Sequence, residues 1–389
     1  PNAVDEYLTY QYVPHPNTIY REFKKLPPGH FAVFEEDRLT VEPYWEPDWN
    51  AEVAITHGEA IERTAELLTD AVKLRLRSDV PLGAFLSGGI DSSLLVALMA
   101  KQLDRKVKTF SIGFSVPEYD ETKYARQVAE HVGTEHHEFR VDPDAAEVLP
   151  DLVWHYDEPF ADSSALPTWY VAKHTREHVT VALSGDGGDE LFAGYPRYKA
   201  TALAEWASRV GLRRFMSSPF WQKLPGSMGR RGPIRRFKRF ASAMGMDPVR
   251  RYLEWICIFN EQRRGELYSS EFVEQLDGSD PFQFIDKLAA KSSKRDLVTT
   301  VSLVDTQSYL PCDLLTKVDI ASMAHSLECR QPFLDVRLVE WAASLPIQWK
   351  LRRGVGKRLL RDAFGDLLPA EIWTRRKMGF GVPIDHWFR

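Results

Sequence analysis

Apolar residues change their spacing several times along the first half of the chain. Between Gly58 and Arg77 they recur every three or four residues, which predicts an amphipathic helix. Short apolar runs then alternate with helical spacing, so we expect strands at residues 81–86, 107–114, 135–141 and 179–183, and helices at 92–103, at 121–132 and within 145–178. This repeated strand-helix-strand order predicts an α/β fold with a mostly parallel, doubly wound sheet and helices on both faces.

The two ends of the chain carry different patterns. Residues 31–34 and 39–41 are strand-like and flank a turn, so residues 1–48 are predicted to form a β-hairpin without a domain of its own. After Tyr198 the apolar residues follow helical spacing, and we expect no further strand. The chain is therefore divided into four predicted parts: residues 1–48, an α/β core at 52–200, a helical insertion at 201–300 and a helical part at 301–389.

Composition narrows the class of protein. A chain of 389 residues, 44% of them hydrophobic and 27% charged, is ordinary for a globular protein with more than one structural unit. No apolar stretch is long enough for a membrane span, and the formal net charge of -5 gives no general reason to bind nucleic acid. We interpret the basic run at residues 229–239 as a solvated surface segment.

Cysteine usage and the first residue bear on the compartment and the extent of the chain. The three cysteines are far apart and lack zinc-ligand spacing, which favours a reducing cytoplasm. The chain begins at Pro1 with no charged-then-apolar leader, so we expect a fragment of a longer protein.

Residues 87–93 (SGGIDSS) join the first predicted core strand to a helix. Open α/β sheets bind ligands at this end of their strands. The glycines let backbone N–H groups approach phosphate oxygens, the serine hydroxyls add donors, and the helix N-terminus adds partial positive charge. The alternative is a plain turn in which Asp91 and Ser92 only cap the helix. The phosphate-binding candidates are Ser87, Gly88, Gly89, Asp91, Ser92 and Ser93.

An aspartate inside an anion site predicts a metal ion. The loop has no lysine after its glycines, unlike the phosphate loop of kinase-like enzymes. Asp91 would repel phosphate unless a cation lay between them, which predicts Mg²⁺ bridging this carboxylate and the pyrophosphate of ATP. A second loop, residues 184–190 (SGDGGDE), follows another strand, and Asp189 is its candidate metal ligand. Read alone, this run also suggests calcium, but the twelve-residue ligand spacing is absent.

Three segments in this order resemble one family. They are SGGIDSS at residues 87–93, SGDGGDELFAGY at 184–195 and LECRQPFLD at 327–335, and they are similar to the synthetase domain of glutamine-hydrolysing asparagine synthetases. The resemblance covers residues 5–389 and implies the ATP pyrophosphatase type of α/β fold. Residues 1–48 resemble the final strands of that family's N-terminal glutaminase domain. Its catalytic cysteine is absent here, so the resemblance implies ammonia supplied by a domain outside this chain.

The resemblance also implies roles for site residues. Asp91 and Asp189 match the family's metal-associated aspartates, and Lys377 resembles a lysine that stabilises negative charge as pyrophosphate leaves. Asp186 stands where some members have Glu and the β-lactam-forming relatives have Tyr, which argues against a β-lactam synthetase, and the resemblance implies a catalytic role for Asp186. The implied adenosine walls are Leu86, Ile112, Ser184 and Gly185. The helical half is expected to close over the acceptor, and the residues named for it are Lys317, Asp319, Glu328 and Arg330. A surface basic cluster is the alternative for Lys377, and an ion pair with Glu328 or Asp335 is the alternative for Arg330.

The implied reaction has two steps. The β-carboxylate of aspartate attacks the α phosphate of ATP to form an acyl adenylate, and ammonia then displaces AMP to give asparagine. Three alternatives stay open: another carboxylate as acceptor, a catalytically silent scaffold, and a nucleic-acid-modifying ATP pyrophosphatase. The retained acids of both loops argue against the scaffold, and the net charge argues against nucleic acid. The sequence is compatible with a homodimer.

Overall fold

The computed structural model describes residues 1–141, 145–218, 220–221, 233–375 and 381. A five-stranded sheet in the order β5-β4-β3-β6-β7 lies at its centre, and every neighbouring pair is parallel. The strands are β3 (Leu82–Phe85), β4 (Lys108–Gly113), β5 (Glu135–Arg140), β6 (Val181–Leu183) and β7 (Glu328–Arg330). The predicted parallel α/β sheet is confirmed, with four of its strands where the apolar runs placed them.

Strand β7 shows that the expectation of no strand after Tyr198 was wrong. The strand has only three residues, Glu-Cys-Arg, and its sequence contains no apolar run that would predict a strand. It forms because β6 offers an open edge: the amide N–H of Glu328 donates to the carbonyl of Thr180 at 3.0 Å, and that of Ser184 donates to the carbonyl of Arg330 at 2.9 Å. Tertiary pairing, rather than local propensity, makes this strand.

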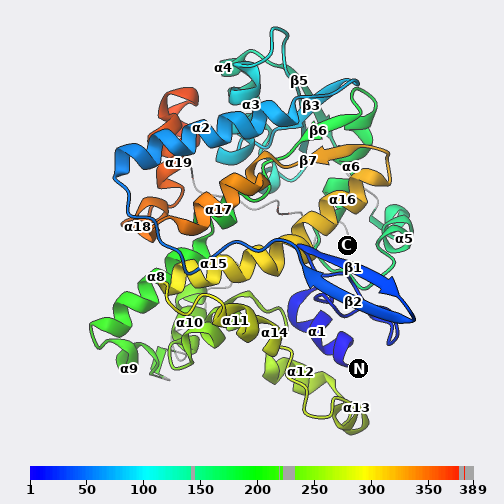
Figure 1. The fold of residues 1–389 in the computed structure, drawn as a ribbon, viewed down its shortest axis with the longest axis vertical. Coiled ribbons are helices and arrows are strands. Elements are labelled where there is room, and N and C mark those ends of the chain that lie inside the picture. The colour runs from blue at the N-terminus through cyan, green and yellow to red at the C-terminus, as the bar shows by residue number, and fades with distance from the viewer. Residues whose placement is uncertain (142–144, 219, 222–232, 376–380, 382–389) are drawn as a thin grey trace.

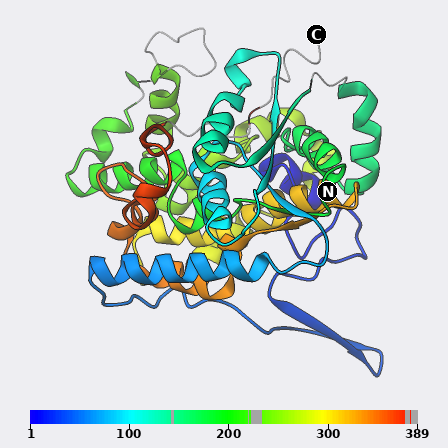
Figure 2. The ribbon, with the colours of Figure 1, turned by 90° about the horizontal axis from the view of Figure 1, so that it is seen from above.

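Helices cover both faces of the sheet, as Figures 1 and 2 show, which confirms the doubly wound arrangement. One face packs against α2 (His57–Arg75), α3 (Ile90–Ala100), α4 (Thr122–Val132), α17 (Val336–Ser344) and α19 (Arg358–Phe364). The other face packs its Phe110 and Ala182 side chains against α6 (Ala165–Arg176), which lies beside α16 (Thr316–Met323). Helix α2 begins at a capping box in which Thr56 and Glu59 satisfy each other's backbone amides.

The helical second half has its own core. Its central helices are α8 (Pro196–Arg209), α11 (Pro248–Ile256), α14 (Gln283–Ala290) and α15 (Leu297–Gln307). The carboxylate of Asp305 is fully buried there and accepts hydrogen bonds from Tyr198, at 2.6 Å, and Tyr252, at 2.5 Å. Arg197 adds an ion pair at 2.8 Å, so the buried carboxylate of Asp305 has a cationic partner.

Shorter elements complete the described chain. The helices are α5 (Ala145–Tyr156), α7 (Gly188–Leu191), α9 (Arg213–Met216), α10 (Pro233–Ala243), α12 (Glu261–Leu267), α13 (Ser270–Gln275), α18 (Ile347–Lys350) and α20 (Ala370–Thr374). Short 3₁₀ turns lie at Pro117–Tyr119, Pro332–Leu334 and Gly365–Leu367, and a π-helical turn spans Leu310–Leu315. Within the described residues, no helix combines the length and apolar character that crossing a bilayer would require.

The N-terminal segment contains the predicted hairpin and a helix that the sequence analysis did not expect. Strands β1 (His30–Glu35) and β2 (Arg38–Pro43) pair antiparallel around the expected turn, and the hairpin projects from the body of the molecule in Figure 2. The unexpected helix is α1 (Asn2–Tyr10). It is held by tertiary contacts, since buried Asp5 forms an ion pair with Arg264 at 2.7 Å.

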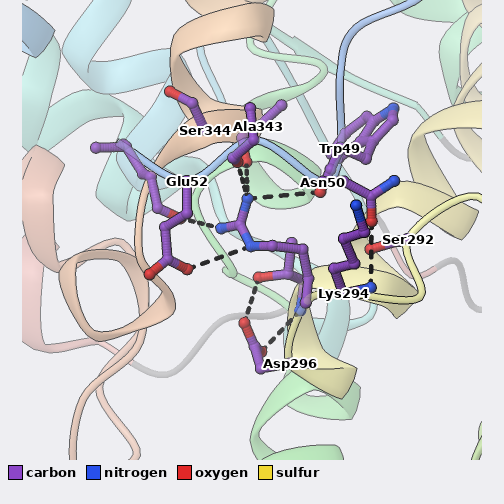
Figure 3. A network of polar contacts seen from close by, with 12 residues as sticks. Trp49, Asn50, Glu52, Ser292, Lys294, Asp296, Ala343 and Ser344 are labelled. Carbon is purple, nitrogen blue, oxygen red and sulfur yellow. Dashed lines mark hydrogen bonds and ion pairs between the residues drawn. The ribbon is translucent and has the colours of Figure 1, made fainter. Parts of the chain in front are cut away.

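The linker between hairpin and core is fastened by a buried arginine. The Arg295 side chain is only 2% exposed and donates to the carbonyls of Ala343, at 3.0 Å, and Leu345, at 2.8 Å. It also pairs with Glu52 of the linker at 3.3 Å. Figure 3 shows this network, with Trp49, Asn50 and Glu52 of the linker lying against the segments of Ser292 and Ser344. This network joins the linker after the hairpin to the helical half and to α17.

Candidate active site

A cavity of about 540 Å³ opens where the strands of the central sheet end. It is lined by both glycine-rich loops, by the ends of β3 and β4, and by helices of the second half. The carboxyl edge of a parallel sheet is where α/β folds bind ligands, because strand ends and helix N-termini meet there. The candidate site therefore brings together segments that are far apart in sequence, for example Ser87 and Lys357, which are about 270 residues apart.

The first loop has the geometry of an anion cradle. Strand β3 ends at Phe85 and α3 begins at Ile90, so the loop between them places the N-terminus of α3 at the cavity. The Ser87 and Ser92 hydroxyls lie 3.1 Å apart and close the loop on itself. Gly88 has φ +68°, and a Cβ there would lie 2.5 Å from Tyr124, so only glycine fits.

Asp91 does not serve as a helix cap. The N-cap of α3 is Gly89, which has no side chain, and the Asp91 carboxylate instead contacts the ammonium of Lys357. Ser92 donates to the Gly89 carbonyl at 3.3 Å, within the loop. The capping interpretation of this loop therefore does not account for Asp91.

The second loop lies directly against the first. It runs from the end of β6 into α7, and its glycines allow the close approach. A Cβ at Gly185 would lie 2.9 Å from the Ser92 amide nitrogen, and one at Gly188 would lie 2.7 Å from the Asp91 carboxylate carbon. Larger residues at these two positions would push the loops apart.

Lys357 connects the two acidic loops. Its ammonium contacts Asp91 and lies 2.6 Å from a carboxylate oxygen of Asp189, and its side chain is only 7% exposed. Burial disfavours the charged ammonium, but the two carboxylates outweigh this effect and raise the pKa of Lys357 above its ordinary value. The lysine is therefore charged and holds both aspartates at one point.

Sequence reasoning missed Lys357, although a signal exists. The run Gly354-Val355-Gly356 precedes it, and such glycines mark a turn that brings backbone close to another segment. The structure shows this approach: the amide N–H of Lys357 donates to the carbonyl of Phe192 at 2.8 Å, and Lys357 itself has φ +53°.

The opposite wall carries a second buried ion pair. The Lys317 ammonium lies 2.7 Å from Asp162 and 2.7 Å from the Ser164 hydroxyl. Asp162 is buried, yet Lys317 and the Ser164 hydrogen bonds lower its pKa. Asp313 lies on the π-helical turn nearby, and burial, aided by the Asp162 charge, raises the pKa of its carboxyl well above the ordinary value. Lys317 thus presents a fixed positive charge to the cavity.

Arg375 joins the C-terminal part of the chain to the first loop. Its guanidinium donates to the Gly88 carbonyl at 2.9 Å, pairs with Glu121 and lies over the Tyr124 ring, 4.1 Å from the centroid. The chain immediately after it, including Lys377, lies outside the described residues.

Most of the sequence-predicted site residues meet in this cavity. Those that line it are Leu86, Ser87, Gly89, Asp91, Ser92, Ile112, Ser184, Gly185, Asp186 and Asp189. Two others sit just behind it, because Tyr124 covers Gly88 and Ser93 is fully buried in the first turn of α3.

Glu328 and Arg330 are not among the described residues that line the cavity. They lie on the edge strand β7, where the Arg330 guanidinium pairs with Glu328 at 2.6 Å. It also donates to the carbonyls of Arg75, at 2.9 Å, and Arg77, at 2.7 Å, at the end of α2. The structure thus shows the ion pair with Glu328 that the sequence left open, with the Arg330 donors turned to α2 rather than to a substrate.

The two loop aspartates form a donor set that suits Mg²⁺. This ion is commonly bound by one or two carboxylates together with substrate phosphates, rather than by an all-protein cage. Asp91 and Asp189 supply two such carboxylates beside the phosphate loop, and the described residues contain no cluster of three or more His, Cys, Asp or Glu that could hold a metal alone. The residues present fit a magnesium ion that arrives with a nucleotide.

This cavity, with two glycine-rich acidic loops at the ends of neighbouring parallel strands, is the ligand-binding arrangement of an open α/β protein. The chain belongs to the asparagine synthase family, whose family model, "Asparagine synthase", matches residues 63–389.

Named relatives agree with this family. The chain is 33% identical to asparagine synthetase [glutamine-hydrolyzing] 1 of Bacillus subtilis, a match that covers 100% of this chain and 60% of the relative. It is 35% identical to a putative asparagine synthetase of Mycobacterium tuberculosis over 100% of this chain and 58% of that protein. A match at 25% identity covers 95% of this chain and 60% of "Amidase chry2" of Gibberella zeae. The chain thus spans about 60% of the length of such relatives.

Proposed function

We propose that this chain activates a carboxylate with ATP and converts it to an amide with ammonia, releasing AMP and pyrophosphate. The observation that carries the proposal is the meeting of two nucleotide-type loops at Asp91, Asp189 and Lys357 in one cavity. The family supports ATP-dependent amide formation in general. The acceptor we propose is aspartate, by way of a β-aspartyl adenylate.

We assign the residues of the two loops and the adjacent strands to the nucleotide and to the metal ion. Leu86 and Ile112 provide apolar walls for adenosine, and Ser184 and Gly185 provide polar and backbone contacts beside them. The loop that starts at Ser87 holds the phosphates through its amides and hydroxyls. Asp91 and Asp189 would hold Mg²⁺, which neutralises phosphate charge when bound.

Acceptor and amine chemistry belong to the opposite wall. The Lys317 ammonium, fixed by Asp162, contacts a carboxylate of the acceptor. Asp186 lines the same cavity and accepts a hydrogen bond from Ser184, which orients its carboxylate. We propose that the Asp186 carboxylate accepts the proton that ammonia loses as it forms the amide, a general-base role that requires a positioned carboxylate. The surrounding helices exclude water, which would otherwise hydrolyse the acyl adenylate.

A glutaminase domain outside this chain is the proposed source of ammonia. Residues 1–48 lie outside the region that the family model matches, and their exposed hairpin suits packing against a preceding domain. Under this proposal the chain by itself uses free ammonia and not glutamine.

A different acceptor is the second candidate. A relative named an amidase aligns over 95% of this chain, so the same scaffold occurs under another activity name. The phosphate and metal contacts that we assign to the two loops do not depend on the acceptor, so they do not distinguish the two candidates. Pyrophosphate release that ignores aspartate but responds to another carboxylic acid would select this candidate.

The test measures products in a defined mixture. With ATP, Mg²⁺, aspartate and ammonium, the chain should release AMP and pyrophosphate one for one with asparagine, and glutamine should not replace ammonium. Asp91→Asn should lower the rate by about 10²-fold or more, because it removes a ligand and a charge at the reacting phosphates. Asp104→Asn, at an exposed position, is the matched control and should keep full activity. Equal activity of the two variants would refute the metal assignment.

A further inference from the structure

Five cationic side chains line the cavity in the part of the chain that the structure describes: Lys199, Lys317, Lys357, Arg361 and Arg375. Three of them already have carboxylate partners in the protein. Lys317 pairs with Asp162, Lys357 with the two loop aspartates, and Arg375 with Glu121. Lys199 and Arg361 therefore stand apart from the rest.

Lys199 and Arg361 come from different helices and face the same space. Lys199 lies in the first turns of α8, and Arg361 lies on α19 one turn after Lys357, since the Arg361 amide donates to the Lys357 carbonyl at 3.0 Å. Arg361 thus lies one turn along α19 from Lys357, the N-cap residue of that helix. The cation pair extends the positive charge of Lys357 away from the loop aspartates.

Neither side chain forms a hydrogen bond or an ion pair with the other described residues. The Nε atom of Arg361 is shielded from solvent without an acceptor. The nearest acid in sequence, Asp362, is turned to His57 at 2.9 Å and to Arg358 at 3.4 Å. Arg361, which is partly buried, therefore lacks the counter-charge that such a cation usually has, and the exposed Lys199 adds a second unpaired positive charge to the cavity wall.

The surroundings of Lys199 and Arg361 disfavour the positive charges of both side chains in the protein alone. Burial and the neighbouring Arg361 charge lower the pKa of Lys199, and burial lowers the pKa of Arg361. The adjacent Asp362 offsets only part of the effect of burial on Arg361, so an anion between the two cations would stabilise both. The feature thus points to an anionic ligand.

The place of the pair identifies the anion. Lys357 contacts both loop aspartates beside the phosphate loop, and Arg361 follows one turn later on the same helix, so the pair continues the phosphate end of the cavity. The acceptor carboxylate has its own cation in Lys317 on the wall formed by α16. A diphosphate carries more negative charge than one carboxylate and needs more cations.

We propose that Lys199 and Arg361 bind the pyrophosphate end of ATP and hold pyrophosphate after it leaves. This rests on the proposed function. As the acceptor carboxylate oxygen bonds to the α phosphorus, the bond from that phosphorus to the bridging oxygen breaks, and its electron pair stays on pyrophosphate. The two cations face the charge that develops there.

Binding of inorganic pyrophosphate, measured by calorimetry with Mg²⁺ present, tests the proposal directly and requires no catalysis. Arg361→Gln and Lys199→Gln should each bind pyrophosphate about tenfold more weakly, the effect of losing one charge-assisted contact. AMP binding and the acceptor KM should stay unchanged. Arg361→Lys should recover part of the affinity, because it restores a charge without the planar fork.

The matched control is Arg358→Gln on the same helix. Arg358 pairs with Asp362 and donates to the Gln348 carbonyl at 3.1 Å, outside the cavity lining, so its loss should leave pyrophosphate binding unchanged. Folding is checked by thermal unfolding; Arg361→Gln should not lower Tm, since the side chain has no acceptor to lose. If a Gln variant unfolds, Arg361→Lys and Lys199→Arg supply the comparison.

Three results would overturn the assignment. Unchanged pyrophosphate binding in both Gln variants would show that Lys199 and Arg361 do not bind pyrophosphate. A raised acceptor KM with normal pyrophosphate binding would reassign the pair to the acceptor carboxylate. An equal loss of pyrophosphate affinity in Arg358→Gln would show that the affinity depends on the net charge of the protein rather than on Lys199 and Arg361. A wild-type chain that forms no AMP with any acceptor would refute the proposed function, while the pyrophosphate comparison would still decide the role of the pair.

Discussion

Lys357 is a shared counter-ion for two carboxylates that come from different loops. Asp91 follows β3 and Asp189 follows β6, and two carboxylates this close repel each other unless a cation lies between them. In the protein alone the ammonium has this role. When a magnesium nucleotide binds, the metal would take over the carboxylates, and the ammonium would be free to contact phosphate.

The residue scale also shows why part of the site could be predicted and part could not. The loop at Ser87 and the aspartates of both loops are recognisable because strand, glycines and helix are contiguous in sequence. Lys357 lies 168 residues after Asp189 and reaches it only through the packing of α19 on the sheet. The glycines at 354 and 356 indicate a turn at this point, but the spacing of residues along the chain does not show which segment the turn meets.

Replacing Lys357 by methionine tests the shared counter-ion. Lys357→Met keeps the length of the side chain but leaves two buried carboxylates without their cation, so we expect a loss of roughly 3 kcal/mol in stability. Added Mg²⁺ should restore part of this loss in the variant and much less in the wild type. Thermal unfolding with and without Mg²⁺ measures both effects. An unfolding temperature equal to that of wild type in the absence of metal would contradict this role.

Elements differ in how far their own residues determine them. Helix α2 carries its capping box and apolar stripe in one continuous segment, and the predicted 58–77 agrees with the observed His57–Arg75. Strand β7 and helix α1 have no such local signal, because an open sheet edge makes the first and contacts with α12 hold the second. Elements that depend on a distant neighbour are those that the sequence pattern missed.

Helix α18 contains a buried lysine, Lys350, whose charged form is disfavoured by burial. The Lys350 side chain is almost fully buried, and its ammonium donates only to the Ala342 carbonyl at 2.9 Å. Burial lowers the pKa of Lys350 from 10.5 to about 8. Because the folded state binds this proton less tightly than the unfolded chain, the wild type gains stability as pH rises from about 8 to 10.5.

Lys350→Met should therefore stabilise the protein near neutral pH, on the order of 3 kcal/mol from a shift of this size. The advantage should shrink as pH rises through 8 and vanish only above about 10.5, where the lysine is neutral in the folded and the unfolded state. Chemical denaturation at several pH values checks the trend. A stability difference that stays constant from pH 7 to pH 10 would show that Met acts through packing alone.

At the scale of the whole molecule, the hairpin of β1 and β2 stands out from the two cores. It leaves the body in Figure 2 and is fastened through the linker that Arg295 holds in Figure 3. Phe34 and Leu39 face each other across the hairpin and are 70% and 62% exposed. The relatives that the chain matches are longer, with about 60% of their length covered. These facts support our proposal that a preceding domain covers the hairpin.

Exposed paired apolar side chains promote self-association in a chain studied alone. The double variant Phe34→Ser, Leu39→Ser should therefore lower the tendency of this chain to associate at high concentration, as light scattering with size-exclusion chromatography measures. Its ammonia-dependent rate and unfolding temperature should match wild type, because the hairpin lies outside the cavity lining and both cores.

Leu267→Ser, at a position 58% exposed on α12, is the control for removing an isolated apolar side chain and should change association little. Equal effects of the two changes would mean that the hairpin has no special part in association. A loss of activity in the hairpin variant would show that this segment supports the active site as well as facing a neighbouring domain.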